Sequence, residues 1–226
     1  MRLSVIVPCY NEGDHIARVI AAVRAVDLPK QVILVDDGST DNTAQVIAAN
    51  NVDNSLEVIT LPTNSGKGAA IRAALEHVRG DVVVIQDADL EYDPSQLPNL
   101  IAPIVRGDAD VVYGSRFKGS IRNMRIQNRL ANYFLTFLAN LLYAARISDE
   151  ATCYKAFRAD LIKSIPLRCD RFEFCPEVTA KIRKRGIRIV EVPIAYVGRT
   201  AAEGKKITWA DGLSAVWTLI KFRFVN

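Results

Sequence analysis

The fold is decided by the stretch Val82-Val83-Val84-Ile85-Gln86-Asp87-Ala88-Asp89-Leu90-Glu91. Its first four residues are apolar and all are β-branched, which predicts a strand buried on both faces. Three carboxylates follow at alternate positions, on Asp87, Asp89 and Glu91. If the backbone stays extended, side chains two residues apart point the same way, so we expect all three to converge beyond the strand.

These carboxylates predict a cation site. Two carboxylates about 5 Å apart repel each other by roughly 3 kcal/mol at an effective dielectric near 20. The cluster therefore needs water or a cation, and Mg²⁺ or Mn²⁺ prefers oxygen ligands and commonly also holds substrate phosphates. An Asp-rich surface turn has the same local pattern, so the flanking motifs must decide between the two interpretations.

The bulk composition indicates one globular domain with a full core. The chain has 226 residues, of which 50% are hydrophobic and 24% are charged. A net charge of only +4 argues against a dedicated nucleic-acid binder. Four cysteines without a C-x-x-C pair, and no secretory signal, predict free thiols in a cytosolic setting. Because no apolar stretch reaches the roughly 20 residues of a spanning helix, we expect peripheral contact with the cytoplasmic membrane face at most.

Strands and helices alternate from the first residue. Apolar runs at 3–7, 31–35, 57–61 and 82–85 predict strands, and segments 14–26, 41–49 and 66–78 between them have helical spacing. This alternation predicts an α/β fold with a doubly wound, mainly parallel sheet. The loops 8–12, 36–41, 64–68 and 87–91 all follow strands, so they should meet along one edge and form one site.

The second half contains two apolar helices. The pattern predicts helices at 93–105, 123–146, 173–185 and 208–224, strands at 110–114, 152–157 and 187–194, and a loop at 115–119. In the helix 123–146, Asn128, Asn132, Thr136 and Asn140 form one polar stripe among many apolar residues. It is either a core helix or a helix at a membrane face or lipid groove. The helix 208–224 carries aromatic residues with cations near its end, which suits a membrane interface or docking on the protein body.

Several motifs in order resemble those of family 2 glycosyltransferases. They are Val7-Pro8-Cys9-Tyr10-Asn11-Glu12, Val35-Asp36-Asp37-Gly38-Ser39-Thr40-Asp41, Asn64-Ser65-Gly66-Lys67-Gly68-Ala69 and Gln86-Asp87-Ala88-Asp89-Leu90-Glu91. With Gly114-Ser115-Arg116, the order is similar to that of the dolichol-phosphate-mannose and dolichol-phosphate-glucose synthase group. The resemblance implies one GT-A domain over 1–226, with a Rossmann-like sheet and inversion at the anomeric carbon. Residues 1–115 would bind the nucleotide sugar, and residues 116–226 would bind the acceptor through interfacial helices.

The resemblance also implies a donor site. Pro8, Tyr10, Glu12 and Asp37 would hold the base and ribose, with Asp36 as a further acceptor of hydrogen bonds. Lys67 would contact the nucleotide, in a loop that lacks the spacing of a Walker A motif. The metal, Mg²⁺ or Mn²⁺, would be held by Asp87, Asp89 and Glu91, beside Ala88, with Asp89 as a catalytic residue.

The acceptor implied by the resemblance is a polyprenyl or dolichyl phosphate. Its phosphate oxygen is ionised near pH 7 and needs cations rather than a strong base, so Arg116 and Arg129 are the expected catalytic partners. Arg199 and Lys205 would close over the donor phosphates. Many relatives have carboxy-terminal spanning helices, whereas this sequence ends at Asn226, so lipid docking would rely on the two apolar helices.

Three alternatives remain open at this stage. The acceptor could be a soluble or cell-wall saccharide, in which case a general base should lie near it. The Asp87-Ala88-Asp89 pattern also occurs in metal-dependent phosphohydrolases, although these usually place it after the first strand. A non-catalytic nucleotide-sugar binder is the third alternative. The sequence decides neither GDP against UDP nor mannose against glucose.

Overall fold

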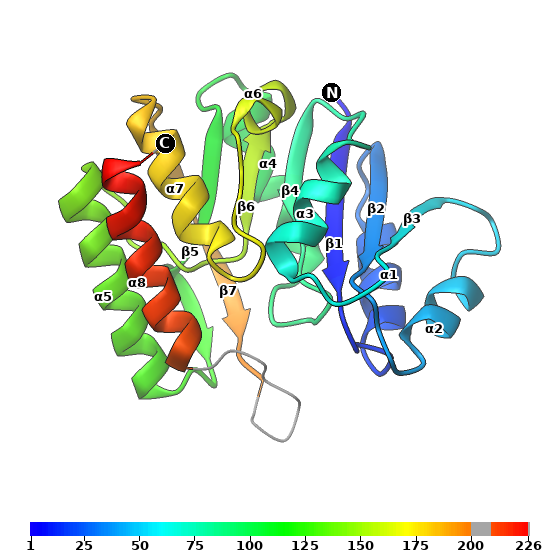
Figure 1. Ribbon diagram of the computed structural model, residues 1–226. Helices are drawn as coiled ribbons and strands as arrows, with labels where there is room; N and C mark the ends of the chain where they lie inside the picture. The colour runs from blue at the N-terminus through cyan, green and yellow to red at the C-terminus, as the bar shows by residue number, and fades with distance from the viewer. Residues whose placement is uncertain (200–208, 226) are drawn as a thin grey trace.

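A seven-stranded sheet forms the centre of the molecule (Figure 1), and the computed structural model describes residues 1–199 and 209–225. The strands are β1 (Leu3–Cys9), β2 (Lys30–Asp36), β3 (Leu56–Thr60), β4 (Val82–Ile85), β5 (Val111–Arg122), β6 (Lys155–Arg158) and β7 (Ile189–Val197). The helices are α1 (Ile16–Ala25), α2 (Thr43–Ala49), α3 (Lys67–Leu75), α4 (Leu97–Val105), α5 (Ile126–Tyr143), α6 (Ala159–Ser164), α7 (Phe174–Lys184) and α8 (Trp209–Phe224), with a 3₁₀ turn at Pro94–Gln96.

The strand order is β3-β2-β1-β4-β6-β5-β7. All pairs are parallel except those of β6, which runs antiparallel between β4 and β5. The mainly parallel sheet is therefore confirmed. Every residue of β1 and β4 is buried, because helices cover both faces of these apolar strands. In Figure 1, α3 and α7 lie in front of the sheet and α1 and α4 behind it.

The predicted loop at 115–119 is wrong, because this segment belongs to β5. Strand β5 pairs with β7 on both sides of a register shift between Ser115 and Ser120. At Gly119, an added Cβ would collide with the backbone carbonyl of Ile194 in β7. The glycines that suggested a loop instead allow two strands to approach closely across a bulge.

Helix α5 has its polar stripe turned inward. Asn140 donates to the Ile147 carbonyl at 2.8 Å and accepts from the Ile147 amide at 3.0 Å. Thr136 accepts from the Glu150 amide at 3.0 Å. The core-helix interpretation is therefore wrong for most of the apolar side chains of α5, which point outward. Those more than half exposed are Ile126, Leu130, Phe134, Phe137 and Leu141.

Helix α8 packs against α5 and α7 and adds to this outer surface (Figure 1). It buries Ala215, Leu219 and Phe222 against its neighbours. Trp209, Leu213, Trp217 and Phe224 are more than half exposed. Docking on the protein body is confirmed for one face of this helix, while the other face is apolar and exposed and the membrane interpretation stays a prediction. Within the described residues, no helix is both long and apolar enough to cross a bilayer.

Candidate functional site

A cavity of about 410 Å³ lies beyond the carboxyl ends of the parallel strands. It brings together residues from all four predicted loops, as the sheet topology requires. Of the predicted donor and metal residues, the cavity is lined by Pro8, Tyr10, Glu12, Asp37, Lys67, Asp87, Ala88, Asp89, Glu91 and Arg199. The convergence of four loops that are far apart in sequence is thus confirmed.

Lys67 and Asp87 form one charged pair at the base of the cavity. The Lys67 ammonium lies 2.5 Å from Asp87 Oδ1 and 2.8 Å from Cys153 Sγ. Burial is the largest influence and opposes ionisation of the carboxylate, but the Lys67 charge, the hydrogen bonds with Cys153 and Lys67 and the Arg199 charge together lower the pKa of Asp87. Burial and the nearby Asp87 charge raise the pKa of the Cys153 thiol well above its usual value. Lys67 therefore faces a carboxylate and a neutral thiol.

Asp89 forms a second pair, with Arg199. The Arg199 Nη2 atom lies 2.7 Å from Asp89 Oδ2, and its Nη1 atom lies 3.3 Å from Glu12 Oε2. Burial is the main reason that the pKa of Asp89 rises to about 7, and the charge of Asp87 adds to it against the opposing effect of Arg199. Asp89 is thus a buried acid whose charge a single arginine offsets only in part.

The Glu91 carboxylate is held by three groups, which belong to Tyr196 and Arg199. The Tyr196 hydroxyl donates to Glu91 Oε2 at 2.8 Å, and the Arg199 amide donates to Oε1 at 2.7 Å. The Arg199 Nε atom lies 3.9 Å from the same Oε1. Glu91 therefore fixes the end of β7, from which Arg199 reaches into the cavity.

The backbone at 87–91 departs from the extended conformation that we expected. Strand β4 ends at Ile85 and the following residues form bends. As a result, the carboxylates of Asp87, Asp89 and Glu91 each contact a polar or charged group of another residue instead of gathering at one point. Among residues 1–199 and 209–225, no three His, Cys, Asp or Glu side chains gather closely enough to hold an ion unaided.

The donor set nevertheless suits a hard divalent ion. Asp87 and Asp89 offer carboxylate oxygens from one loop, and each is paired with a cation, Lys67 or Arg199. A metal held by one or two carboxylates and completed by substrate phosphates is the usual arrangement for Mg²⁺.

Asp36 and Asp37 shape the loops around the cavity. The Asp37 carboxylate accepts from the Ser65 amide at 2.8 Å and from the Gly66 amide at 2.7 Å. Asp36 accepts from the Ser39 amide at 3.0 Å, and the structure does not bring it to the cavity. The expected role of Asp36 in donor binding therefore has no geometric support, since its carboxylate closes a turn.

The loop that carries Lys67 is locked to a distant segment. Gly66 has φ +101°, and a Cβ added there would lie 2.5 Å from the Asp170 carbonyl oxygen. An added Cβ at Gly68 would lie closer still to the carbonyl of Cys169. The Ala69 amide donates to the Asp170 carbonyl at 2.9 Å. Only glycine allows this contact, so the two glycines fix the position of Lys67.

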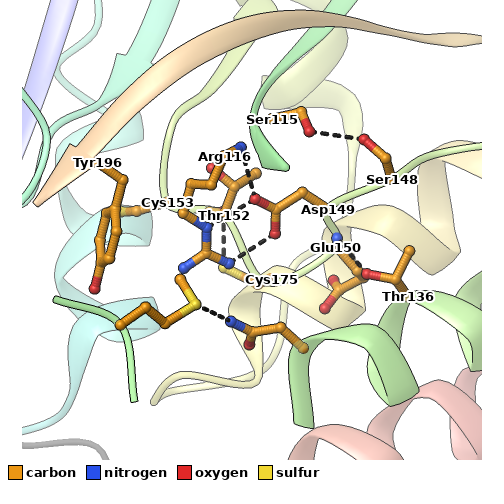
Figure 2. Close-up of polar contacts among 12 residues, drawn as sticks. Ser115, Arg116, Thr136, Ser148, Asp149, Glu150, Thr152, Cys153, Cys175 and Tyr196 are labelled. Carbon is orange, nitrogen blue, oxygen red and sulfur yellow. Dashed lines mark hydrogen bonds and ion pairs between the residues drawn. The ribbon is translucent and has the colours of Figure 1, made fainter. Parts of the chain in front are cut away.

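The predicted acceptor arginines lie outside this cavity. Arg116 is buried and forms a bidentate pair with Asp149, with Nε and Nη2 each 2.7 Å from a carboxylate oxygen (Figure 2). The Tyr196 ring centre lies 5.3 Å from the Arg116 guanidinium carbon, and the Tyr196 hydroxyl donates to the cavity residue Glu91. Arg129 is exposed on α5, where its guanidinium lies over the Tyr133 ring. Lys205 lies outside the described residues.

Sequence reasoning missed several residues of the cavity wall. These are Cys9, Asn64, Gly66, Ala70, Arg171, Phe172 and Asp211. Cys9, Asn64 and Gly66 were within reach, since they belong to quoted motifs. Arg171 and Phe172 come from a segment with no local signal, and the packing of 169–171 on the Lys67 loop brings them to the site. Asp211 lies in the predicted helix 208–224, whose pattern did not single out this acid. The Nδ1 atom of His15 also lies 3.3 Å from Glu12 Oε2.

Comparisons with known proteins agree with this architecture. Residues 4–165 match the family described as Glycosyl transferase family 2. The chain is 32% identical over 230 residues to the low-salt glycan biosynthesis hexosyltransferase Agl6 of Haloferax volcanii, covering 99% of this chain and 53% of that protein. It is 32% identical over 213 residues to the undecaprenyl-phosphate 4-deoxy-4-formamido-L-arabinose transferase of Edwardsiella ictaluri, covering 90% of this chain and 62% of that protein. The chain thus spans between half and two thirds of these curated relatives.

A solved structure shares the fold. Glucosyl-3-phosphoglycerate synthase from Mycobacterium tuberculosis, solved with Mn²⁺, uridine diphosphate and glucosyl-3-phosphoglycerate, superposes with a TM-score of 0.73. The two proteins are 23% identical, and the match covers 99% of this chain and 80% of that one. The single α/β domain described above is therefore a GT-A fold. With the family match over residues 4–165, the chain belongs to glycosyl transferase family 2.

Proposed function

We propose that this chain transfers a hexose, mannose or glucose, from a nucleotide-diphosphate sugar to a polyprenyl phosphate with inversion at the anomeric carbon. The observation that carries the proposal is the cavity beyond the parallel strands, where Lys67 and Arg199 face Asp87 and Asp89. Two acids and two cations in one cavity suit a diphosphate that arrives with a divalent ion. Relatives whose names include a hexosyltransferase and an undecaprenyl-phosphate transferase support this class of reaction.

Within this proposal, each cavity residue would contact one part of the bound donor. Asp87 and Asp89, with Glu91 beside them, would hold Mg²⁺ or Mn²⁺, and the ion would offset charge that develops on the diphosphate leaving group. Pro8, Tyr10, Glu12 and Asp37 would surround the base and ribose. Lys67 and Arg199 would contact the diphosphate.

Arg116 and Arg129 stay our proposed ligands of the acceptor phosphate. Asp149 holds Arg116 in one orientation, and Tyr196 contacts both Arg116 and the cavity residue Glu91. A preoriented guanidinium matches a phosphate better than a mobile one, because less conformational freedom is lost on binding. Residues 116–226 would thus form the acceptor half of the domain.

Peripheral contact with a membrane is part of the same proposal. The exposed apolar side chains of α5 and α8 form one surface, since the two helices pack side by side. Arg125 and Arg129 lie at the start of α5, and Lys221 and Arg223 lie near the end of α8. Apolar and aromatic side chains with flanking cations are typical of helices that lie in the interface of an anionic bilayer.

The test is turnover with a panel of GDP- and UDP-sugars, a short-chain polyprenyl phosphate, and Mn²⁺ or Mg²⁺. We expect a lipid-linked sugar to form with one nucleotide, and the metal chelator EDTA to abolish it. Free sugar without a lipid-linked product would contradict the proposed acceptor. A sugar transferred to an added saccharide would instead support the alternative acceptor class.

A further inference from the structure

The positively charged side chain of Arg199 lies among the acidic residues of the donor cavity. Its guanidinium nitrogens lie 2.7 Å from Asp89 Oδ2 and 3.3 Å from Glu12 Oε2. Its Nε atom, 3.9 Å from Glu91, is buried without a hydrogen-bond partner. The side chain is 15% exposed. The guanidinium therefore reaches carboxylates that follow two different strands, β1 and β4.

A divalent ion bound to Asp89 would need part of the space that the Arg199 guanidinium occupies. Mg²⁺ binds carboxylate oxygen at about 2.0–2.1 Å and requires near-octahedral surroundings. A guanidinium nitrogen at 2.7 Å from Asp89 Oδ2 fills part of that coordination sphere and adds a like charge. The metal and Arg199 would therefore compete for Asp89, because the charge of either cation weakens the binding of the other.

We propose that Arg199 is the resident counter-ion of the donor site and that a divalent metal displaces it from Asp89. This inference rests on the proposed metal-dependent function and adds a competition between the ion and a side chain of the protein. The displaced guanidinium is then available to the diphosphate, which binds arginine in a bidentate manner. Metal alone should bind poorly, and metal with a nucleotide diphosphate should bind well.

The competing explanation is that Arg199 only holds the acids in place. Its backbone amide and side chain both contact Glu91, and Glu12 also has His15 beside it. If holding were its whole role, removal of the guanidinium would let the acids move apart and would weaken metal binding. The two explanations therefore predict changes of opposite sign.

The experiment is a titration of the full chain with Mn²⁺ alone, with free Mn²⁺ followed by electron paramagnetic resonance. We expect Arg199→Met to bind Mn²⁺ at least fivefold more tightly than the unaltered protein, and Arg199→Lys to fall between them. Arg171→Met is the matched control, because Arg171 lines the same cavity without an ion pair in the described part of the chain. It removes the same charge and should change the affinity less than twofold.

A substitute variant and added nucleotides distinguish the possible results of this titration. Arg199→Gln repeats the measurement if the methionine variant fails to fold, as judged by circular dichroism. Equal or weaker Mn²⁺ binding by folded Arg199 variants would overturn the inference while leaving a metal-dependent transferase intact. If neither the unaltered protein nor any variant binds Mn²⁺, with or without UDP or GDP, both the inference and the proposed metal dependence fail.

Discussion

Arg116 and Asp149 form a bidentate ion pair that is almost closed to solvent, with both nitrogen–oxygen distances at 2.7 Å (Figure 2). Asp149 also accepts from the Arg116 backbone amide at 2.9 Å. Three hydrogen bonds thus join β5 to the segment that leads into β6. Burial would lower the pKa of the Arg116 guanidinium, but the surrounding Tyr92 and Asp149 groups raise it, so the arginine stays charged.

Asp149→Asn should therefore be strongly destabilising. The substitution keeps the shape but leaves a buried guanidinium without its counter-charge, which typically costs about 3–5 kcal/mol of unfolding free energy. Urea denaturation measures this change. The control is Asp160→Asn, which breaks the exposed pair with Arg158 and should leave the midpoint unchanged. Equal midpoints for the two variants would contradict a structural role for the buried pair.

The pKa of Asp89, raised to about 7 by burial and by Asp87, predicts a pH-dependent site. Protons compete with a divalent ion for this carboxylate, so Mn²⁺ affinity should fall as the pH drops below about 7 and level off above it. Calorimetric titration between pH 5.5 and 8.5 measures this profile. A profile that is flat across this range would contradict the assignment of Asp89 as a metal ligand.

The same shift predicts a stability effect without metal. Between about pH 4 and 7 the folded protein holds a proton on Asp89 that the unfolded chain releases, because the unfolded pKa is near 3.8. This contribution is present at low pH and is lost as the pH rises through 7. Asp89→Asn mimics the protonated acid, so it should be more stable than the unaltered protein at pH 8, with a difference that shrinks toward pH 5.

Gly68→Ala should damage the donor site. The added Cβ would collide with the backbone carbonyl of Cys169, and neither backbone can yield cheaply, so we expect a loss of about 1–3 kcal/mol in unfolding free energy. Nucleotide affinity should fall with it, because Lys67 precedes this glycine. Gly212→Ala in α8 is the control, since nothing lies within 4 Å of its Cβ position. It should be neutral or stabilise by up to about 1 kcal/mol.

The exposed surface of α5 and α8 predicts binding to anionic vesicles. Phe137→Glu and Trp217→Glu each place a negative charge on an exposed apolar position, and each should reduce co-sedimentation with phosphatidylglycerol vesicles at least fivefold. Val52→Glu, on an equally exposed position that belongs to neither helix, should bind as the unaltered protein does. Equal sedimentation of all three variants would place the membrane contact elsewhere.

Local sequence patterns predicted much of this fold, because in the first half of the chain the apolar runs and the helical spacing indicate the elements that form. Short, β-branched runs such as Val82–Ile85 favour buried strands, and the loops after parallel strands have to meet at one edge. Turn chemistry misled the prediction at 115–119, where the glycines serve close strand packing. The antiparallel insertion of β6 had no local signal, because pairing partners depend on contacts across the whole chain.

The candidate site was predictable in its residues and less so in its pairings. The motifs identified Asp87, Asp89 and Lys67, but that Asp89 pairs with Arg199, 110 positions later, is set by the path of β7. Asp36 and Asp37 are adjacent and chemically identical, so the sequence could not tell that only Asp37 reaches the cavity. On α5, periodicity revealed the polar stripe but not which side of the helix the protein covers.

The segment before the antiparallel strand β6 limits how the sequence of this family member can change. This short segment carries Asp149, which holds Arg116, and Cys153, which touches Lys67. Residues 149–153 therefore contact both Arg116, in the proposed acceptor site, and Lys67, in the proposed donor site. Mutational drift in this segment should shift both Michaelis constants together, whereas changes in the outer loops can tune one substrate at a time.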